Sequence, residues 1–170
     1  MDGPPAMALG VDPARPGIMS EPPRAPGAEI LTLRRLAGLG SLAATMTLGT
    51  LGIYFFARAD GDETYAATLA FTTFVLFQFF NVFNARAEHG SAFTRHFFSN
   101  RLLWLALLGV IVLQVLAVHW PPLQAVFRTT ALSATDWGLA IAVASSVLVV
   151  EELRKLLVKL IRRRGDKAKT

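Results

Sequence analysis

The sequence predicts an all-α membrane protein, a four-helix transmembrane bundle preceded by an irregular proline-rich segment. Three observations predict this class. Hydrophobic residues make up 53% of the chain, and the mean hydropathy is +0.45. Charged residues make up only 17% of it, whereas soluble domains contain about 25%. Finally, the apolar residues are gathered into uncharged runs that are too long for the core elements of a soluble domain.

Four uncharged runs define the expected helices. The runs 36–57 and 64–85 contain 22 residues each, which is about 33 Å of helix against a hydrocarbon core of about 30 Å. The run 102–118 has 17 residues, and the run 137–150 has 14 and needs its flanks to span. Barrel strands would be about ten residues long and would alternate in polarity. We therefore expect helices over 36–57, 64–85, 102–118 and 134–158.

The basic residues indicate the orientation. If both termini and the connection between the second and third helices are cytoplasmic, only Arg58 and Arg128 of the 17 basic residues lie outside, as the positive-inside rule requires. We expect a multi-pass protein of the plasma membrane, with lipid as its partner and no nucleic acid, because the basic residues flank helices. The expected divisions are a cytoplasmic segment 1–34, a membrane domain 35–161 and a basic tail 162–170.

Residue types needed for catalysis and metal binding are scarce. The chain has no cysteine, so it has neither a thiolate metal site nor a cysteine nucleophile. The histidines His89, His96 and His119 fall in two expected loops and form no pair on one helical face. A phosphate-binding loop of the G-x-x-x-x-G-K-[ST] type is absent from the sequence. No catalytic residue, metal site or bound cofactor is expected.

Polar side chains are concentrated in the second expected helix. Gln78, Asn81 and Asn84 follow at steps of three among many phenylalanines, which places them near one face. Buried amides of this kind stabilise contacts between membrane helices. Gln78 and Asn81 could instead border an ion pathway, since carbonyl oxygens suit hard cations such as Ca²⁺ or Na⁺. Both interpretations remain open at this point.

Several segments resemble P-type cation-transporting ATPases of the calcium-pump type. Residues 2–10 read D-G-P-P-A-M-A-L-G and residues 19–24 read M-S-E-P-P-R, similar to the end of the sixth membrane helix of these pumps and the loop after it. Residues 68–86 resemble their eighth helix. The resemblance implies that Asp2 is the transport-site aspartate and that Gln78 occupies the position of a carboxylate in pumps that carry two calcium ions. The neutral amide at this position departs from the pattern and leaves the ion open.

The resemblance implies that this chain is the C-terminal membrane region of a pump, which scaffolds the transport helices and has no catalytic activity alone. The implied partners are the upstream half of the pump and its cation, Ca²⁺ or Na⁺. ATP and Mg²⁺ would act only through that missing portion, because the phosphorylation and nucleotide-binding motifs are absent from this sequence. Two alternatives remain: a small four-helix oligomeric transporter and a non-transporting membrane partner.

Further expectations concern local structure. The prolines within residues 3–28 predict a mostly irregular segment. Ser133 or Thr135 should cap the last helix. Glu151 and Glu152 should lie at the membrane interface in ion pairs with basic residues three or four positions later. Small residues at every fourth position predict close helix contacts at two seams, which are Ser41, Thr45 and Gly49 in the first helix and Gly138, Ala142 and Ser146 in the last.

Overall fold

The computed structural model describes residues 3–11, 19, 32–59, 62–86 and 100–167. These residues form six helices and no strand: α1 (Gly3–Gly10), α2 (Leu33–Arg58), α3 (Glu63–Arg86), α4 (Arg101–His119), α5 (Pro121–Phe127) and α6 (Ala134–Lys167). The all-helical prediction is therefore confirmed, and a helix covers each of the four expected ranges. Helices α2, α3 and α4 have slightly wider bounds than expected, and α6 starts at the expected residue and continues nine residues further.

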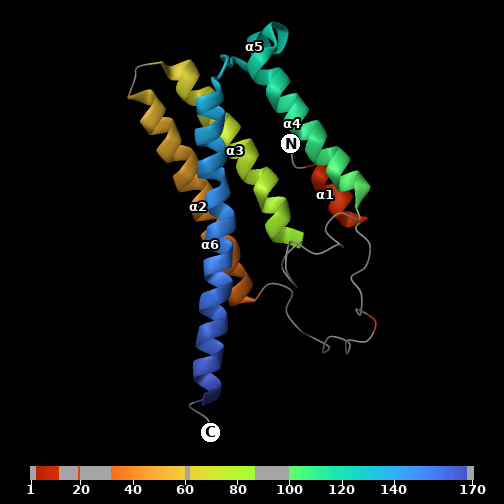
Figure 1. Ribbon diagram of the computed structural model, residues 1–170, viewed down its shortest axis with the longest axis vertical. Helices are drawn as coiled ribbons and strands as arrows, with labels where there is room; N and C mark the ends of the chain where they lie inside the picture. Colours follow the sequence, from red (N-terminus) through yellow and green to blue (C-terminus); the bar gives the residue numbers. More distant parts are fainter. Residues whose placement is uncertain (1–2, 12–18, 20–31, 60–61, 87–99, 168–170) are drawn as a thin grey trace.

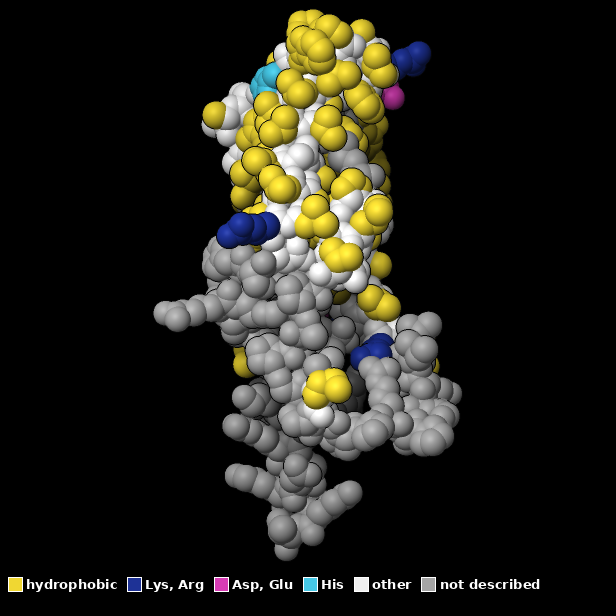
Figure 2. All heavy atoms as spheres, turned by 90° about the vertical axis from the view of Figure 1, so that its right-hand side faces the viewer, with side chains coloured by type: hydrophobic (Ala, Val, Ile, Leu, Met, Phe, Trp, Pro, Cys, Tyr) yellow, Lys and Arg dark blue, Asp and Glu magenta, His cyan; other side chains and the backbone are white. Residues whose placement is uncertain are grey.

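Three of the described helices are long and apolar enough to cross a membrane, namely Arg35–Arg58, Glu63–Ala85 and Arg101–His119. Helix α6 is not one of these three, so the expected four-span bundle is not confirmed. Figure 2 shows apolar side chains over most of the described part of the face that carries α4 and α5. A surface this apolar is typical of contact with lipid.

The helices form two groups that meet at α3 (Figure 1). Helices α2, α3 and α6 pack against one another, and α1 packs against α4, which also contacts α3. Buried apolar residues of α2, α3 and α6 form the larger core, with Phe77 of α3 fully buried in it. The smaller core joins α1 to α4 through Ala8, Leu103 and Leu107.

Helix α1 corrects the expectation of an irregular start. Pro4 and Pro5 lie in its first turn, where backbone N–H groups have no partner within the helix, so proline costs little there. The helix ends at Gly10, and residues 12–18 and 20–31 lie outside the described part of the chain. The short helix α5 was also not expected. It begins with two prolines after Trp120 and ends at Phe127, and the C-cap residue Arg128 has a left-handed φ of 52°.

Side-chain hydrogen bonds join the helix ends on the side where α5 lies. Ser133 and Asp136 cap α6 reciprocally: the Asp136 N–H donates to Ser133 Oγ at 3.2 Å, and the Ser133 N–H donates to Asp136 Oδ2 at 2.7 Å. This is a capping box, in which each side chain satisfies a backbone N–H of the other residue, and it bears out Ser133 as a cap. The hydroxyl of Tyr65 in α3 donates to Asp136 Oδ1 at 2.7 Å.

His119 lies not in a loop but at the end of α4, where its ring stacks on Trp137. His89 and His96 lie outside the described residues.

Two further expectations concern α6, namely its ion pairs and its seam of small residues. Glu151 pairs with Arg154 at 2.6 Å, and Glu152 pairs with Lys155 at 3.1 Å, as expected. The Glu151 side chain is buried against the protein, and its position at the membrane interface stays a prediction. The predicted seam of α6 was wrong at Gly138, where an added Cβ would have no described neighbour within 4 Å. The buried small side chains of α6 are instead Ala140 and Ala144.

Candidate functional site

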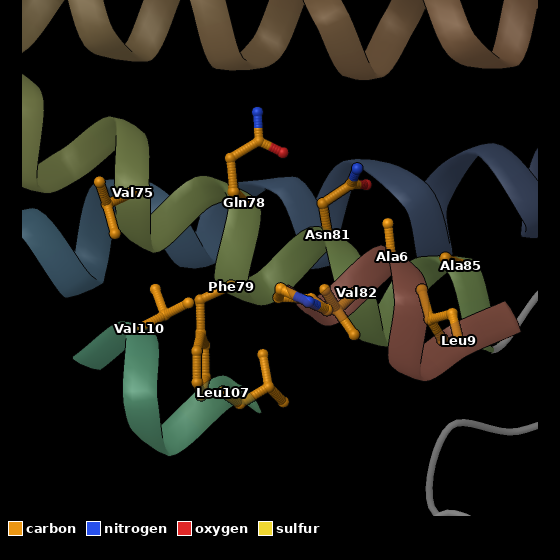
Figure 3. A pocket seen from close by; sticks show the side chains of 11 residues that line it. Ala6, Leu9, Val75, Gln78, Phe79, Asn81, Val82, Ala85, Leu107 and Val110 are labelled. Carbon is orange, nitrogen blue, oxygen red and sulfur yellow. The ribbon is translucent and has the colours of Figure 1, made fainter. Parts of the chain in front are cut away.

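A cavity of about 150 Å³ lies between α1, α3 and α4 (Figure 3). Its walls are mostly apolar, and two polar side chains, Gln78 and Asn81, lie on its α3 wall. The remaining lining residues come from all three helices: Pro5, Ala6 and Leu9 from α1, Val75, Phe79, Val82 and Ala85 from α3, and Leu107 and Val110 from α4. An apolar cavity with a few polar groups is the usual form of a small-ligand site.

Gln78 and Asn81 project to the same side of α3, as their spacing of three residues requires, with Ala6 of α1 beside Asn81 (Figure 3). Both side chains are partly buried. Neither carboxamide forms a hydrogen bond with another described residue, whereas Asn84, one turn further along, donates to the backbone carbonyl of Val147 in α6 at 3.3 Å. The structure thus separates the three amides: Asn84 joins two helices, and Gln78 and Asn81 line the cavity.

Asp2, the third candidate residue, lies outside the described residues. It immediately precedes α1 in the sequence, and α1 forms one wall of the cavity. Ala8 of α1 is 1% exposed and packs with Leu103 and Leu107 of α4. The helix that follows Asp2 is therefore held against α4 beside the two amides.

The chemistry that the described residues offer here is neutral. Carboxamide oxygens can coordinate hard cations, but tight sites usually include carboxylates. No group of three or more histidine, aspartate or glutamate side chains comes together in the described part of the chain. The buried carboxylate of Glu151 is occupied by two hydrogen bonds from the Arg154 guanidinium, at 2.6 and 2.8 Å. Among the described residues, no carboxylate lines the cavity beside Gln78 and Asn81.

Sequence reasoning missed two polar residues that the structure shows to be buried. Gln114 is fully buried in α4 and donates from Nε2 to Thr72 Oγ1 of α3 at 2.9 Å. Asn100, 5% exposed, contacts both α1 and α4. The signals existed: a single glutamine interrupts the apolar run 102–118, and an asparagine directly before an apolar run is a common helix cap.

The chain is similar to known proteins over most of its length. Residues 1–157 match the family described as cation transporting ATPase, C-terminus. The chain is 39% identical over 165 residues to calcium-transporting ATPase type 2C member 2 of Mus musculus, covering 96% of this chain and 18% of that protein. It is 38% identical over 162 residues to calcium-transporting ATPase 1 of Saccharomyces cerevisiae, covering 92% of this chain and 17% of the relative.

A third relative is human calcium-transporting ATPase type 2C member 1, which is 36% identical over 156 residues, or 91% of this chain and 17% of that protein. The chain therefore spans less than a fifth of the length of these curated relatives. Its membrane-length apolar helices and this family match identify an integral membrane protein. The chain belongs to the family of cation-transporting P-type ATPases, and it corresponds to their C-terminal domain.

Proposed function

We propose that this chain acts in Ca²⁺ transport, as the C-terminal membrane region of a calcium pump whose ATP-hydrolysing portion lies upstream. The relatives are named calcium-transporting ATPases. In this proposal the upstream portion binds ATP and Mg²⁺, and this chain supports the transport helices without catalysing hydrolysis. The observation that carries it is that Gln78 and Asn81, which form no hydrogen bond with another described residue, line a cavity that the helix directly after Asp2 also lines.

The proposed cation pathway combines Asp2 with Gln78 and Asn81. The Asp2 carboxylate supplies negative charge, and the two carboxamide oxygens supply neutral ligands from α3. A single ion fits this set better than two, since Gln78 carries no charge to offset a second divalent ion.

The proposed membrane arrangement has four spans, with α6 as the fourth. Residues 1–34 would be the end of a pump helix and the cytoplasmic loop after it, residues 35–161 the membrane domain and residues 162–170 a cytoplasmic tail. Both termini would face the cytoplasm, in the plasma membrane. The distribution of basic residues supports this orientation, and Glu151 with its partner Arg154 would lie near the inner boundary.

A chimera tests the function. This chain would replace the matching C-terminal stretch of calcium-transporting ATPase 1 of Saccharomyces cerevisiae, and ATP-dependent uptake of Ca²⁺ into membrane vesicles would be measured. We expect uptake by the chimera and none by the chain alone. Uptake by the chain alone would contradict the proposed role. So would a stable, correctly inserted chimera whose rate of ATP hydrolysis does not change when Ca²⁺ is added.

Substitutions of the two amides test the pathway. Gln78→Leu and Asn81→Leu in the chimera should each raise the Ca²⁺ concentration for half-maximal uptake by about tenfold, because each removes a coordinating oxygen worth roughly one hydrogen bond to a charged group. Phe74→Leu is the matched control, since Phe74 lies on α3, is exposed and does not line the cavity. Equal effects of all three substitutions would refute the assignment of the amides.

A further inference from the structure

Asn100 connects two helices that are far apart in the sequence. Its Nδ2 donates to the backbone carbonyl of Ala8 in α1 at 2.8 Å, and its Oδ1 accepts from the backbone N–H of Leu103 in α4 at 2.9 Å. The side chain is 5% exposed, and Ala8 and Leu103 are 1% and 2% exposed. One carboxamide thus caps the start of α4 and holds the end of α1.

The hydrogen bond to Ala8 has a clear physical role. The last four carbonyls of a helix have no partner within it, and Ala8 lies two residues before the end of α1 at Gly10. An unpaired carbonyl in a dry interior costs free energy that the Asn100 amide removes. A helix of eight residues is also too short to be stable without tertiary contacts. The position of α1 therefore depends on this contact and on the apolar packing around it.

We propose that Asn100 is a positioning residue for the cation pathway, because it fixes α1 against α4 and so places the α1 wall of the cavity opposite Gln78 and Asn81. Its effect on transport rests on the proposed function, whereas the fixing of α1 does not. Pro5, Ala6 and Leu9 line the cavity from α1, and Asp2 precedes the same helix. A shift of α1 would therefore move the site without removing any ligand.

Three substitutions separate the two roles of Asn100. Asn100→Ser retains a good helix cap for α4 but loses the donor to Ala8. Asn100→Asp also retains the cap and turns a carboxylate oxygen toward the Ala8 carbonyl, which repels it. The control Thr32→Ala removes the cap of α2, where Thr32 Oγ1 accepts from the Arg35 N–H at 3.3 Å. It leaves the contact between α1 and α4 intact.

The first experiment measures the position of α1 in the chain itself, reconstituted in lipid nanodiscs. The sequence contains no cysteine, so spin labels can be attached through Met7→Cys and Leu102→Cys, two exposed positions on α1 and α4. Double electron–electron resonance should give a narrow distance distribution in this background and with Thr32→Ala. Asn100→Ser and Asn100→Asp should broaden it. An unchanged distribution in both Asn100 variants would overturn the proposal.

The second experiment measures transport in the yeast chimera. Asn100→Ser should raise the Ca²⁺ concentration for half-maximal uptake about tenfold, while the maximal rate per inserted pump stays within about twofold. A merely structural role would lower the maximal rate and the pump level instead. Broadened distances with unchanged Ca²⁺ dependence would overturn the link to the cation pathway. Absence of uptake by the unsubstituted chimera would refute the proposed function, and the spin-label result would still decide the role of Asn100.

Discussion

Gln114 shows how a single buried side chain can be half satisfied. Its Nε2 donates to Thr72 Oγ1, but its Oε1 is buried and has no hydrogen-bond partner among the residues that the structure describes. Both residues are fully buried between α3 and α4. An unpaired carbonyl costs about 1–3 kcal/mol, which offsets the roughly 0.5–1.5 kcal/mol that a hydrogen bond contributes. The net effect of this amide on stability is therefore close to zero or unfavourable.

Replacing Gln114 with leucine should test this balance. Gln114→Leu fills a similar volume and removes the unpaired oxygen, so we expect the free energy of unfolding to stay the same or rise by about 1 kcal/mol. Thr72 could then donate to a carbonyl of its own helix, as Thr73 does to Leu69. Gln114→Ala should instead lose about 2–4 kcal/mol through a cavity. Denaturation of the purified chain in detergent measures both. Equal losses in the two variants would mean that Oε1 has a partner.

The three candidate amides of α3 show what sequence alone can and cannot establish at this scale. The spacing of Gln78, Asn81 and Asn84 correctly predicts that they lie near one face of a helix. The spacing does not indicate which amide contacts another helix and which lines a cavity, because that depends on how the other helices pack against α3. The structure gives Asn84 the Val147 carbonyl and gives Gln78 and Asn81 the wall shared with α1 and α4.

Helix contacts depend on which face carries small residues and on what lies opposite. An added Cβ at Gly49 of α2 would lie 2.6 Å from Cζ and 2.8 Å from Cε2 of Phe77. The Phe77 ring is fully buried in the larger core, so it has little room to move. Gly49 therefore permits the close approach of α2 to α3, as the sequence pattern indicated.

Substituting Gly49 should separate this steric role from helix propensity. Gly49→Ala should lower the free energy of unfolding by about 1–3 kcal/mol, because the methyl group overpacks the contact with Phe77. Gly52→Ala is the control: Gly52 lies on the same helix, and its added Cβ would have no described neighbour within 4 Å. This variant should be neutral or stabilise by about 0.5–1 kcal/mol. Thermal unfolding of the chain in detergent checks both. Similar results for both variants would remove Gly49 from the α2–α3 contact.

The predictions for α1 and for the contact face of α6 were wrong for identifiable physical reasons. Pro4 and Pro5 suggested irregular backbone, but proline is harmful only beyond the first turn of a helix, and α1 begins just before them. The pattern of small residues placed the α6 seam at Gly138 and Ala142 rather than at Ala140 and Ala144. Small residues occur on more than one face of α6, and only the position of α2 and α3 selects the face that is buried.

At the scale of the whole molecule, two helix groups share α3 and leave the cavity between them. The larger group of α2, α3 and α6 has its own buried core, while α1 and α4 contact it less extensively. The composition predicts membrane helices and their order. It could not predict the cavity, because that depends on α1, a helix of eight residues, lying beside a helix more than 90 positions later.

Helix α6 decides the topology of the whole chain. It contains 34 residues, about 50 Å at about 1.5 Å per residue, which exceeds a hydrocarbon core of about 30 Å. Its capped start at Ser133 and its buried ion pair at Glu151 lie about 27 Å apart along the helix by the same rise. These two polar groups could therefore lie at opposite membrane boundaries, with α6 as a fourth span.

Cysteine labelling in intact cells tests this arrangement, since the sequence has no cysteine of its own. A membrane-impermeant maleimide should label Ala59→Cys, after α2, and Ala131→Cys, before α6, both exposed positions. It should label Thr170→Cys only after the cells are permeabilised, because a crossing α6 places the C-terminus inside with the basic tail. Labelling of Thr170→Cys and Ala131→Cys alike in intact cells would show that α6 does not cross. If Thr170→Cys is labelled in intact cells while Ala59→Cys and Ala131→Cys are protected, the orientation is the reverse of the proposed one. The unsubstituted chain should remain unlabelled throughout and supplies the background.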